Sequence, residues 1–454
     1  MQTPRLWTTL VIEASPDDIR TDHPRHRDAM AYWCVRADAQ NTPMDLRVEV
    51  TDLSSSLRLD RDPDFPSSAS FMSSLLRPWV DRIRRLHLIV FDIRDVRDLF
   101  SWEGSKCEEE EKEGRVWTFA NLEWLVIELE ASFPHDPCVL TAFQFATQLR
   151  TASIQNGMAE EFINIILPWR NLTSLEVYSV TERVWSQLMI ECCSLEKGTS
   201  DIDKSKRLPI VDATLYHLTS LTVWSLGKSD ISIFDGIRLP ALREFALFGE
   251  PSHDAFARSA PQHLYRQLNS LTTLSLQHIS TNHTISLLHQ TTHLKALNMM
   301  IEPDHAVLFA ALTFRFTAES ELLLPRLERI CVRRPYKGYK SFGVPSFVAM
   351  IVSRSLLRIP IRMSPLQVVE LETPLSSLSP SGHDLKREEL DAGLEGPRHI
   401  HKLECDLPKV SYVDWKNPFL LGSSVCSQSP VMNPLILALS NQQPFQMARG
   451  ATST

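Results

Sequence analysis

Two histidines spaced four residues apart are the best candidate in this sequence for metal chemistry. His289 and His293 could present two imidazoles on one face of a helix, where they could bind zinc. A helical zinc enzyme would carry a Glu directly after the first histidine, and Gln290 stands there instead. Leu294 begins a strand-like pattern, so the helix should end before His293. We therefore expect surface or turn histidines, with no metal and no cofactor.

The chain also lacks the motifs of nucleophilic catalysis and nucleotide binding. It contains no Gly-x-Ser-x-Gly elbow, no Gly-x-Gly-x-x-Gly turn and no phosphate-binding loop. Ser381, His383 and Asp384 have the residue types of a triad, but residues this close in sequence cannot adopt its geometry. The sequence favours a protein that is not an enzyme. An enzyme with a site scattered along the chain is the third-ranked hypothesis.

A six-residue pattern that recurs nine times is the strongest indication of the fold. Each copy has an aliphatic residue, two variable residues, an apolar residue, one variable residue and another aliphatic residue, as in Leu218-Thr-Ser-Leu221-Thr-Val223. The last two apolar residues are two apart, so they share one face of an extended strand. The copies begin at Ile83, Leu122, Leu172, Leu218, Leu242, Leu271, Leu294, Leu327 and Leu366.

The spacing of these copies is typical of a leucine-rich repeat. The gaps from Leu218 to Leu327 are 24, 29, 23 and 33 residues, and the other gaps, of 39, 50, 46 and 39 residues, predict insertions. The pattern predicts an α/β fold, an irregular leucine-rich-repeat-like solenoid with a curved parallel sheet and helices outside. The alternative is an α/β domain with coincidental Leu-x-x-Leu motifs. Helical apolar spacing lies at residues 140–149, 160–167, 182–192, 262–268, 285–289, 306–314 and 347–351.

Three aromatic residues follow the last aliphatic position of neighbouring copies. Tyr178, Trp224 and Phe248 should point away from the core. If the copies stack in order, these side chains form an aromatic strip on the concave face, where large aromatics are typical binding anchors. The equally weighted alternative is that another segment covers them and makes them part of a satellite core.

Composition excludes several classes of partner and compartment. The 454 residues carry a net charge of -8 and no long basic stripe, so nucleic-acid binding is not expected. No apolar run approaches the ~18 residues of a membrane span, and no secretory signal is visible. The eight irregularly spaced cysteines have no Cys-x-x-Cys pair and are typical of reduced thiols. We expect a cytoplasmic or nuclear protein that does not bind membranes.

Composition and pattern also divide the chain. Residues 1–50 precede the repeat array, which we place at 51–371 with an acidic loop at 101–115. The Ser-, Pro- and charge-rich stretch 372–398 predicts a disordered linker, and 399–454 a poorly defined C-terminal segment and tail.

The N-terminal segment resembles the end of an F-box in mushroom-type fungal F-box proteins. The resemblance rests on Thr3-Pro4-Arg5-Leu6-Trp7-Thr8-Thr9-Leu10, then on a helix with Trp33-Cys-Val-Arg36-Ala37, then on Pro43 and a short strand. Further features are Arg84-Arg-Leu-His-Leu88, the Leu-Pro-x-Leu copies and Val352-Ser-Arg354 after an apolar helix. The resemblance covers roughly residues 3–371.

This resemblance implies a substrate receptor of a Skp–cullin–F-box ubiquitin ligase, with a protein target held by the repeat array. Pro4, Leu6 and Trp7 would then be an F-box remnant. The helices that bind the Skp adaptor precede this segment in the family, so adaptor binding is expected only if the F-box is completed upstream of Met1. The alternative function is that of a free-standing leucine-rich-repeat scaffold without a ligase.

Overall fold

A computed structural model provides the structure for most of the repeat array and for short segments outside it. The structure describes residues 9–14, 28, 31–33, 35–36, 44–50, 76–90, 96, 99–100, 117–129, 139–155, 165–203, 212–226, 234, 236–249, 267–277, 279, 281–300, 305–313, 323–333, 344–355, 364–374, 410–415 and 435–437. Within these ranges, no helix has the length and apolarity needed to cross a membrane.

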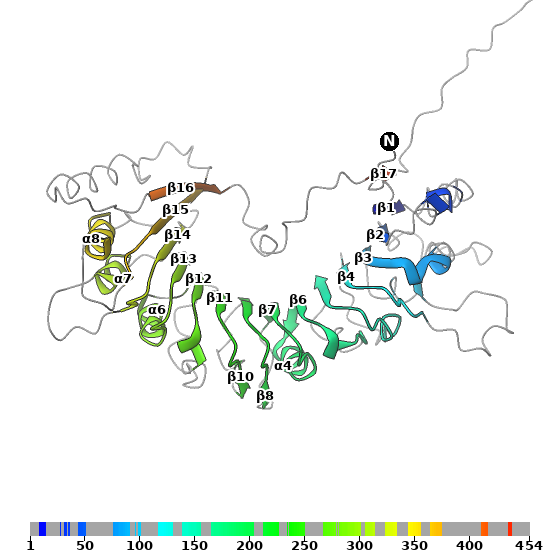
Figure 1. The fold of residues 1–454 in the computed structure, drawn as a ribbon, viewed down its shortest axis with the longest axis horizontal. Coiled ribbons are helices and arrows are strands. Elements are labelled where there is room, and N and C mark those ends of the chain that lie inside the picture. The colour runs from blue at the N-terminus through cyan, green and yellow to red at the C-terminus, as the bar shows by residue number, and fades with distance from the viewer. Residues whose placement is uncertain are drawn as a thin grey trace, which may run out of the picture.

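One long parallel sheet organises the described part of the chain. Its strands follow the order β16-β15-β14-β13-β12-β11-β9-β7-β6-β5-β4-β3-β2-β1-β17, so that nearly every strand pairs with its neighbours in sequence. The sheet curves into an arch (Figure 1). The strands are β1 Thr9–Ala14, β2 Met44–Val50, β3 Ile83–Val90, β4 Trp124–Leu129, β5 Thr151–Gln155, β6 Ser174–Thr181, β7 Lys197–Asp203, β9 Ser220–Leu226, β11 Glu244–Gly249, β12 Thr273–Gln277, β13 Ala296–Met300, β14 Arg329–Arg333, β15 Val368–Pro374, β16 Val410–Trp415 and β17 Leu435–Leu437.

Helices and a small second sheet lie along the outer side of the arch (Figure 1). This sheet pairs β8 (Ala213–Thr214) with β10 (Ile237–Arg238). The protein is thus an α/β solenoid of the irregular leucine-rich-repeat type, as the repeat pattern predicts. The α-helices are α4 Glu182–Glu191, α6 Thr281–Leu288, α7 His305–Leu312 and α8 Val344–Ser355, and the short 3-10 turns are η2 Arg77–Arg82, η5 Trp169–Asn171 and η7 Leu268–Ser270.

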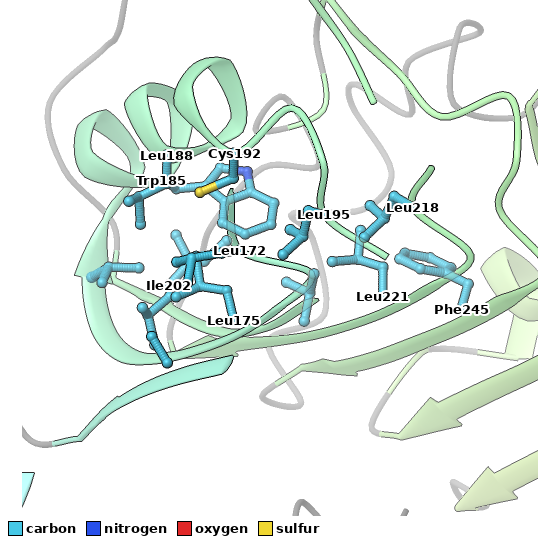
Figure 2. Close-up of a cluster of buried hydrophobic side chains, with 14 of the residues drawn as sticks. Leu172, Leu175, Trp185, Leu188, Cys192, Leu195, Ile202, Leu218, Leu221 and Phe245 are labelled. Atoms are coloured by element: carbon cyan, nitrogen blue, oxygen red, sulfur yellow. The ribbon is translucent and has the colours of Figure 1, made fainter. Parts of the chain in front are cut away.

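Alternation along each strand builds the core. In β6, Leu175 and Val177 are buried and Glu176 between them is only half-buried, because successive side chains point to opposite faces. The register aligns Leu221 of β9 with Phe245 of β11, so the buried positions form continuous rows across the strands. Figure 2 shows Leu172 and Leu175 beneath Trp185 and Leu188 of α4 and beneath Cys192, which directly follows the helix. The Thr181 hydroxyl caps α4 by accepting a hydrogen bond from the amide of Val184.

All nine copies of the repeat become strands, and between the first and the last copy the main sheet contains two further strands that the pattern missed. β5 and β7 follow Leu149 and Leu195, where Ala152, Gly198 and Ser200 replace the expected aliphatic residues. We call one repeat unit, from its first leucine to the next, a coil of the solenoid. The insertions predicted in the gaps of 50 and 46 residues are therefore wrong, since each gap contains one additional coil. With these coils included, the first leucines at 149, 172, 195 and 218 recur every 23 residues.

The helical spacing from Leu140 to Leu149 was a wrong indication of a helix. These residues form successive turns, with hydrogen bonds from the amide of Ala146 to the carbonyl of Phe143 and from Leu149 to Ala146. Both bonds span three residues, so the apolar period of three comes from turns and not from a 3.6-residue helix. The helices expected at 182–192, 285–289, 306–314 and 347–351 are present as α4, α6, α7 and α8.

A ladder of backbone hydrogen bonds links the start of each coil to the start of the next. The residue after the first leucine offers its carbonyl to two amides of the next coil. Arg150 accepts from Thr173 and Ser174 at 2.8 and 3.0 Å, and Thr173 accepts from Glu196 and Lys197 at 2.8 and 3.0 Å. The pattern continues through Glu196, Thr219, Arg243, Thr272, Lys295 and Glu328. This ladder satisfies backbone groups that would otherwise be orphaned at the turn into each strand.

A buried arginine ties α8 to the coils beside it. Arg354 is 2% exposed and donates from Nε to the carbonyl of Leu312 at 2.7 Å and from Nη1 to that of Leu324 at 3.0 Å. Its Nη2 donates to the carbonyl of Leu323. Leu324 has a φ of 55°, a backbone conformation that disfavours a branched side chain, and the guanidinium holds this turn in place. Burial lowers the pKa of Arg354 to about 10.

The sheet extends beyond the boundaries predicted for the array. β1 and β2 of the N-terminal segment pair in parallel with each other, and β2 pairs with β3. β15 continues to Pro374, past the predicted end of the array at Leu371, and β16 and β17 come from the C-terminal segment. Residues 101–115, most of 372–398 and most of 399–454 lie outside the described residues.

Candidate binding surface on the inner face of the sheet

The aromatic residues predicted for the concave face occupy half-buried positions on the strand face opposite the core. Trp224 of β9 and Phe248 of β11 are in register and stack, with ring centroids 4.1 Å apart and an interplanar angle of 27°. Both alternate with buried neighbours, so the rings point away from the apolar core. A stacked pair of this kind buries part of its own surface and still presents an aromatic edge to a partner.

Tyr178 belongs to the same surface but is not adjacent to Trp224. β7 lies between β6 and β9, and Asp201 of β7 is in register with Trp224. The condition for the predicted strip, that the copies stack directly in order, is not met between Tyr178 and Trp224, because β7 lies between them and lacks the aliphatic pattern.

A bulge in β6 sets the position of Tyr178. Val177 pairs with Ser200 and Val180 with Ile202, so Tyr178 and Ser179 together oppose the single residue Asp201. Ser179 has a φ of 58°, the left-handed conformation that an extra residue in a strand often adopts. The bulge thereby places the phenol of Tyr178 beside the carboxylate of Asp201.

Glu176 adds a second carboxylate to this surface. It lies on the inner face of β6, and the hydroxyl of Ser153 donates a hydrogen bond to its Oε2 at 3.3 Å. Burial raises the pKa of Glu176, and the Ser153 hydrogen bond offsets part of that rise. Gln155 in turn donates to the Ser153 hydroxyl at 3.3 Å. The carboxylate is therefore partly desolvated and has a neutral hydrogen-bond donor beside it.

Electrostatics link the two carboxylates to the tyrosine. Burial, and then the negative charges of Glu176 and Asp201, raise the pKa of Tyr178 to about 12. The phenol is accordingly neutral at physiological pH. The surface formed by Glu176, Tyr178, Asp201, Trp224 and Phe248, which we call the acidic-aromatic surface, combines ring faces with negative charge and lies on adjacent strands.

Nearer the N-terminal end of the sheet, the inner face carries a carboxylate of a different kind. His87 of β3 donates from Nε2 to Oε1 of Glu128 on β4 at 2.9 Å. That hydrogen bond is the main reason why the pKa of Glu128 is lowered. The His87 ring also meets Trp124 edge-on, with centroids 6.2 Å apart. Glu128 thus has its partner within the protein.

The histidines considered for zinc do not form a site. α6 ends at Leu288, so His289 and His293 follow the helix and do not share a helical face. Burial lowers the pKa of His283, which lies within α6. Across the described residues, no group of three His, Cys, Asp or Glu side chains could hold a metal ion. Ser381, His383 and Asp384 lie outside the described residues, as do Pro4, Leu6 and Trp7.

A groove of about 310 Å³ lies on the outer side, between α4 and the turn that precedes β6. Its lining is mostly aliphatic and includes Ile166, Trp169 and Leu188, with Glu191 at its margin. Nearby, Cys192 directly follows α4 and is buried in the core, and this burial raises the pKa of its thiol. The two polar side chains of its lining, Gln187 and Glu191, are hydrogen-bonded to each other at 2.9 Å.

Sequence reasoning found the aromatic members of the surface and missed the two carboxylates. Asp201 was missed because β7 itself was missed, although Leu195 with Gly198 and Ser200 keeps the repeat spacing. Glu176 occupies the variable position between Leu175 and Val177, where one sequence gives no reason to single out a residue.

Comparisons with known proteins add little to this geometry. No protein-family model matches the chain, and no curated protein matches it. Among solved structures, a Bacteroides fragilis protein determined as a structural genomics target is similar, with 12% sequence identity and a TM-score of 0.30. The similarity covers 55% of this chain and 69% of that chain, and at this level it supports no inference about function.

Proposed function

We propose that the protein is a non-enzymatic recognition module that binds another protein on the inner face of its sheet. The observation that supports this most directly is the stacked pair of Trp224 and Phe248, half-buried on the face opposite the core. Tryptophan is enriched among residues that dominate interface energies, because a large rigid ring buries area at a low entropic penalty. The curved solenoid offers several parallel strands on which such anchors are held in fixed register.

We further propose that this recognition serves a Skp–cullin–F-box ubiquitin ligase, with the chain as substrate receptor or a relative of one. The support is the resemblance of the N-terminal segment and of the repeat features to fungal F-box proteins. A free-standing scaffold without a ligase is the alternative. Co-purification with a Skp adaptor separates the two when the chain is expressed with any in-frame coding sequence upstream of Met1, because the adaptor-binding helices of the family precede this segment. A receptor with a completed F-box retains the adaptor, and a scaffold does not.

Partner capture by a Trp224→Ala variant tests the recognition function. Truncating an interface anchor commonly costs 2 kcal/mol or more of binding, which corresponds to at least a roughly thirtyfold loss of affinity. We expect the variant to lose partners that the wild-type chain retains when it is immobilised and exposed to an extract of cells that express it. Quantitative mass spectrometry of the retained proteins provides the measurement.

Tyr216→Ala is the matched control, because this tyrosine is 69% exposed and precedes the strand instead of lying on its inner face. It should retain the same partners as the wild type. Thermal unfolding of both variants distinguishes lost binding from lost folding. Equal retention of partners by Trp224→Ala and wild type would contradict the proposed surface, and collapse of the fold in Trp224→Ala would assign the ring to the core.

A further inference from the structure

The outer side of α4 carries a row of exposed side chains beside the apolar groove. Arg183, Gln187 and Ile190 are exposed, and Ile190 is 55% exposed although it is a large apolar residue. Residues three and four apart share one side of a helix, so these three side chains lie in one row. Trp185, on the other side of the helix, packs into the core (Figure 2). The row is therefore directed away from the solenoid.

The groove lies directly beside this row. Its wall on α4 includes Val184, Gln187 and Glu191, and its other wall is aliphatic apart from Trp169. An apolar cavity of roughly 150 Å³ holds a small hydrocarbon ligand. The groove, at about 310 Å³, therefore has room for an aliphatic side chain. The same helix thus presents an exposed isoleucine and a recess that fits one.

The charges at the two ends of the row have the signs that the helix dipole disfavours. Arg183 is the second residue of α4 and Glu191 is the last. The N-terminal end of a helix favours carboxylates and the C-terminal end favours cations, so both side chains oppose the dipole. Gln187 donates a hydrogen bond to Glu191 at 2.9 Å, but an amide leaves the charge of the carboxylate uncompensated. The stability of the single helix does not account for these two charges.

A second copy of the chain fits this surface. A two-fold dimer brings the same patch of both copies together, so the patch must be complementary to itself. When two α4 helices pack antiparallel with Gln187 at the two-fold axis, residues equally far before and after position 187 meet. Arg183 then faces Glu191 of the second copy. By the same symmetry, Ile190 faces Val184, which lines the groove.

We propose that the protein forms a weak homodimer through the outer side of α4, in which Ile190 of each copy enters the groove of the other. A helix of 10 residues is about 15 Å long, so this contact is smaller than the roughly 800 Å² per partner of a standard interface. We therefore expect a dissociation constant in the micromolar range. α4 lies on the outer side of the arch (Figure 1), so the dimer leaves the inner face of the sheet available to a partner. The inference goes beyond the proposed recognition function and does not depend on it.

Sedimentation velocity of the full chain over a range of concentrations tests the dimer. The wild type should show a monomer–dimer equilibrium. Ile190→Asp should weaken dimerisation at least about tenfold, since it brings a charge into an apolar groove. Val307→Asp is the matched control, because Val307 is 53% exposed on α7 and its replacement should leave the equilibrium unchanged. Thermal unfolding of both variants checks that the fold is retained.

Charge reversal tests the antiparallel pairing. Arg183→Glu and Glu191→Arg should each dimerise poorly alone, since like charges then meet at both ends of the helix pair. An equimolar mixture of these two variants should form a heterodimer, because opposite charges meet again at both ends. Both reversals introduce charges that the helix dipole favours, so neither should unfold α4. Arg326→Glu, at an exposed arginine that precedes β14, is the control and should dimerise as wild type does.

Three outcomes would contradict the inference. A wild-type chain that stays monomeric at several hundred micromolar would overturn the homodimer, and so would an Ile190→Asp variant that dimerises as strongly as wild type. Failure of the two mixed charge variants to associate would overturn the antiparallel pairing of α4. The Trp224→Ala comparison measures partner capture on the inner face, so its result is independent of all three.

Discussion

Glu128 and Glu176 lie two strands apart on the same face of one sheet, yet their carboxylates have opposite environments. Glu128 on β4 accepts a hydrogen bond from His87, and its pKa is lowered. Glu176 on β6 accepts only a longer bond from the Ser153 hydroxyl, and burial raises its pKa. The first region satisfies its charge internally and gains stability from it. In the second region burial disfavours the charge, and the Ser153 hydrogen bond offsets only part of that effect.

Disrupting the coil of β7, which pairs with the strand of Glu176, should cause the largest change in stability. A Cβ at Gly198 would lie 3.2 Å from Cδ1 of Leu221 and 3.5 Å from Cδ2 of Leu195, so there is no space for a larger side chain. Gly198→Leu should lower the free energy of unfolding by about 1–3 kcal/mol through overpacking. Thermal unfolding measures the loss.

Hydrogen exchange on the same variant shows where the loss falls. Because repeats contact mainly their neighbours, amides of β6 to β9 should lose more protection than those of β3 and β4. Gly198→Ala is the milder control and should cost less than the leucine variant. Uniform loss of protection across both regions would show that the two behave as one unit.

Removing the charge of Glu176 should have a smaller effect of opposite sign. Its folded-state pKa is raised above the model value of 4.5, so ionisation favours the unfolded chain once the pH exceeds that value. Glu176→Gln should therefore raise the free energy of unfolding at pH 7 by up to about 1 kcal/mol. The gain should disappear below about pH 4, where the wild-type carboxyl is protonated in both states. Urea unfolding at pH 7 and pH 3.5 provides the measurement, and a destabilised variant at pH 7 would contradict it.

Removing the charge of Glu128 should have the smallest effect. The pKa of Glu128 is lowered from 4.5, so its stabilising contribution is present above that value and is lost as the pH falls through the lowered pKa. Both side chains are partly exposed, with 21% and 33% exposure for His87 and Glu128, which limits the contribution to less than about 1 kcal/mol. Glu128→Gln should unfold slightly more easily than wild type at pH 7 and equally at low pH. If Glu128→Gln and Glu176→Gln changed the free energy of unfolding at pH 7 in the same direction, the contrast between the two carboxylates would be wrong.

The repeat pattern predicted the fold because large aliphatic residues occupy most of the inward strand positions. It failed where Ala152 and Gly198 occupy those positions, since small residues pack there only with the help of neighbours such as Leu221. The predicted number of residues per coil was therefore too large in the middle of the array. The hidden strand β7 is also the reason why Tyr178 and Trp224 appeared to be neighbours.

The candidate surface was only partly predictable for a related reason. Aromatic residues at outward positions stand out in a sequence, and Trp224 and Phe248 indeed stack. A carboxylate such as Glu176 is unremarkable at an outward position, because charged residues are common there. Glu176 is distinguished by its burial, which raises the pKa of its carboxyl. This burial depends on neighbouring strands that only the three-dimensional arrangement brings together.

The 23-residue recurrence of Leu149, Leu172, Leu195 and Leu218 also bears on how the chain reaches its folded state. Each of these coils pairs with the next along the sequence, so the contacts in this block close short loops at a small entropic penalty. Low contact order favours rapid folding, and linear arrays can nucleate locally and grow outwards. The coils from β5 to β9 are therefore the expected folding nucleus. The part of the acidic-aromatic surface on β6, β7 and β9 would form early, and Phe248 on β11 would join it as the next coil is added.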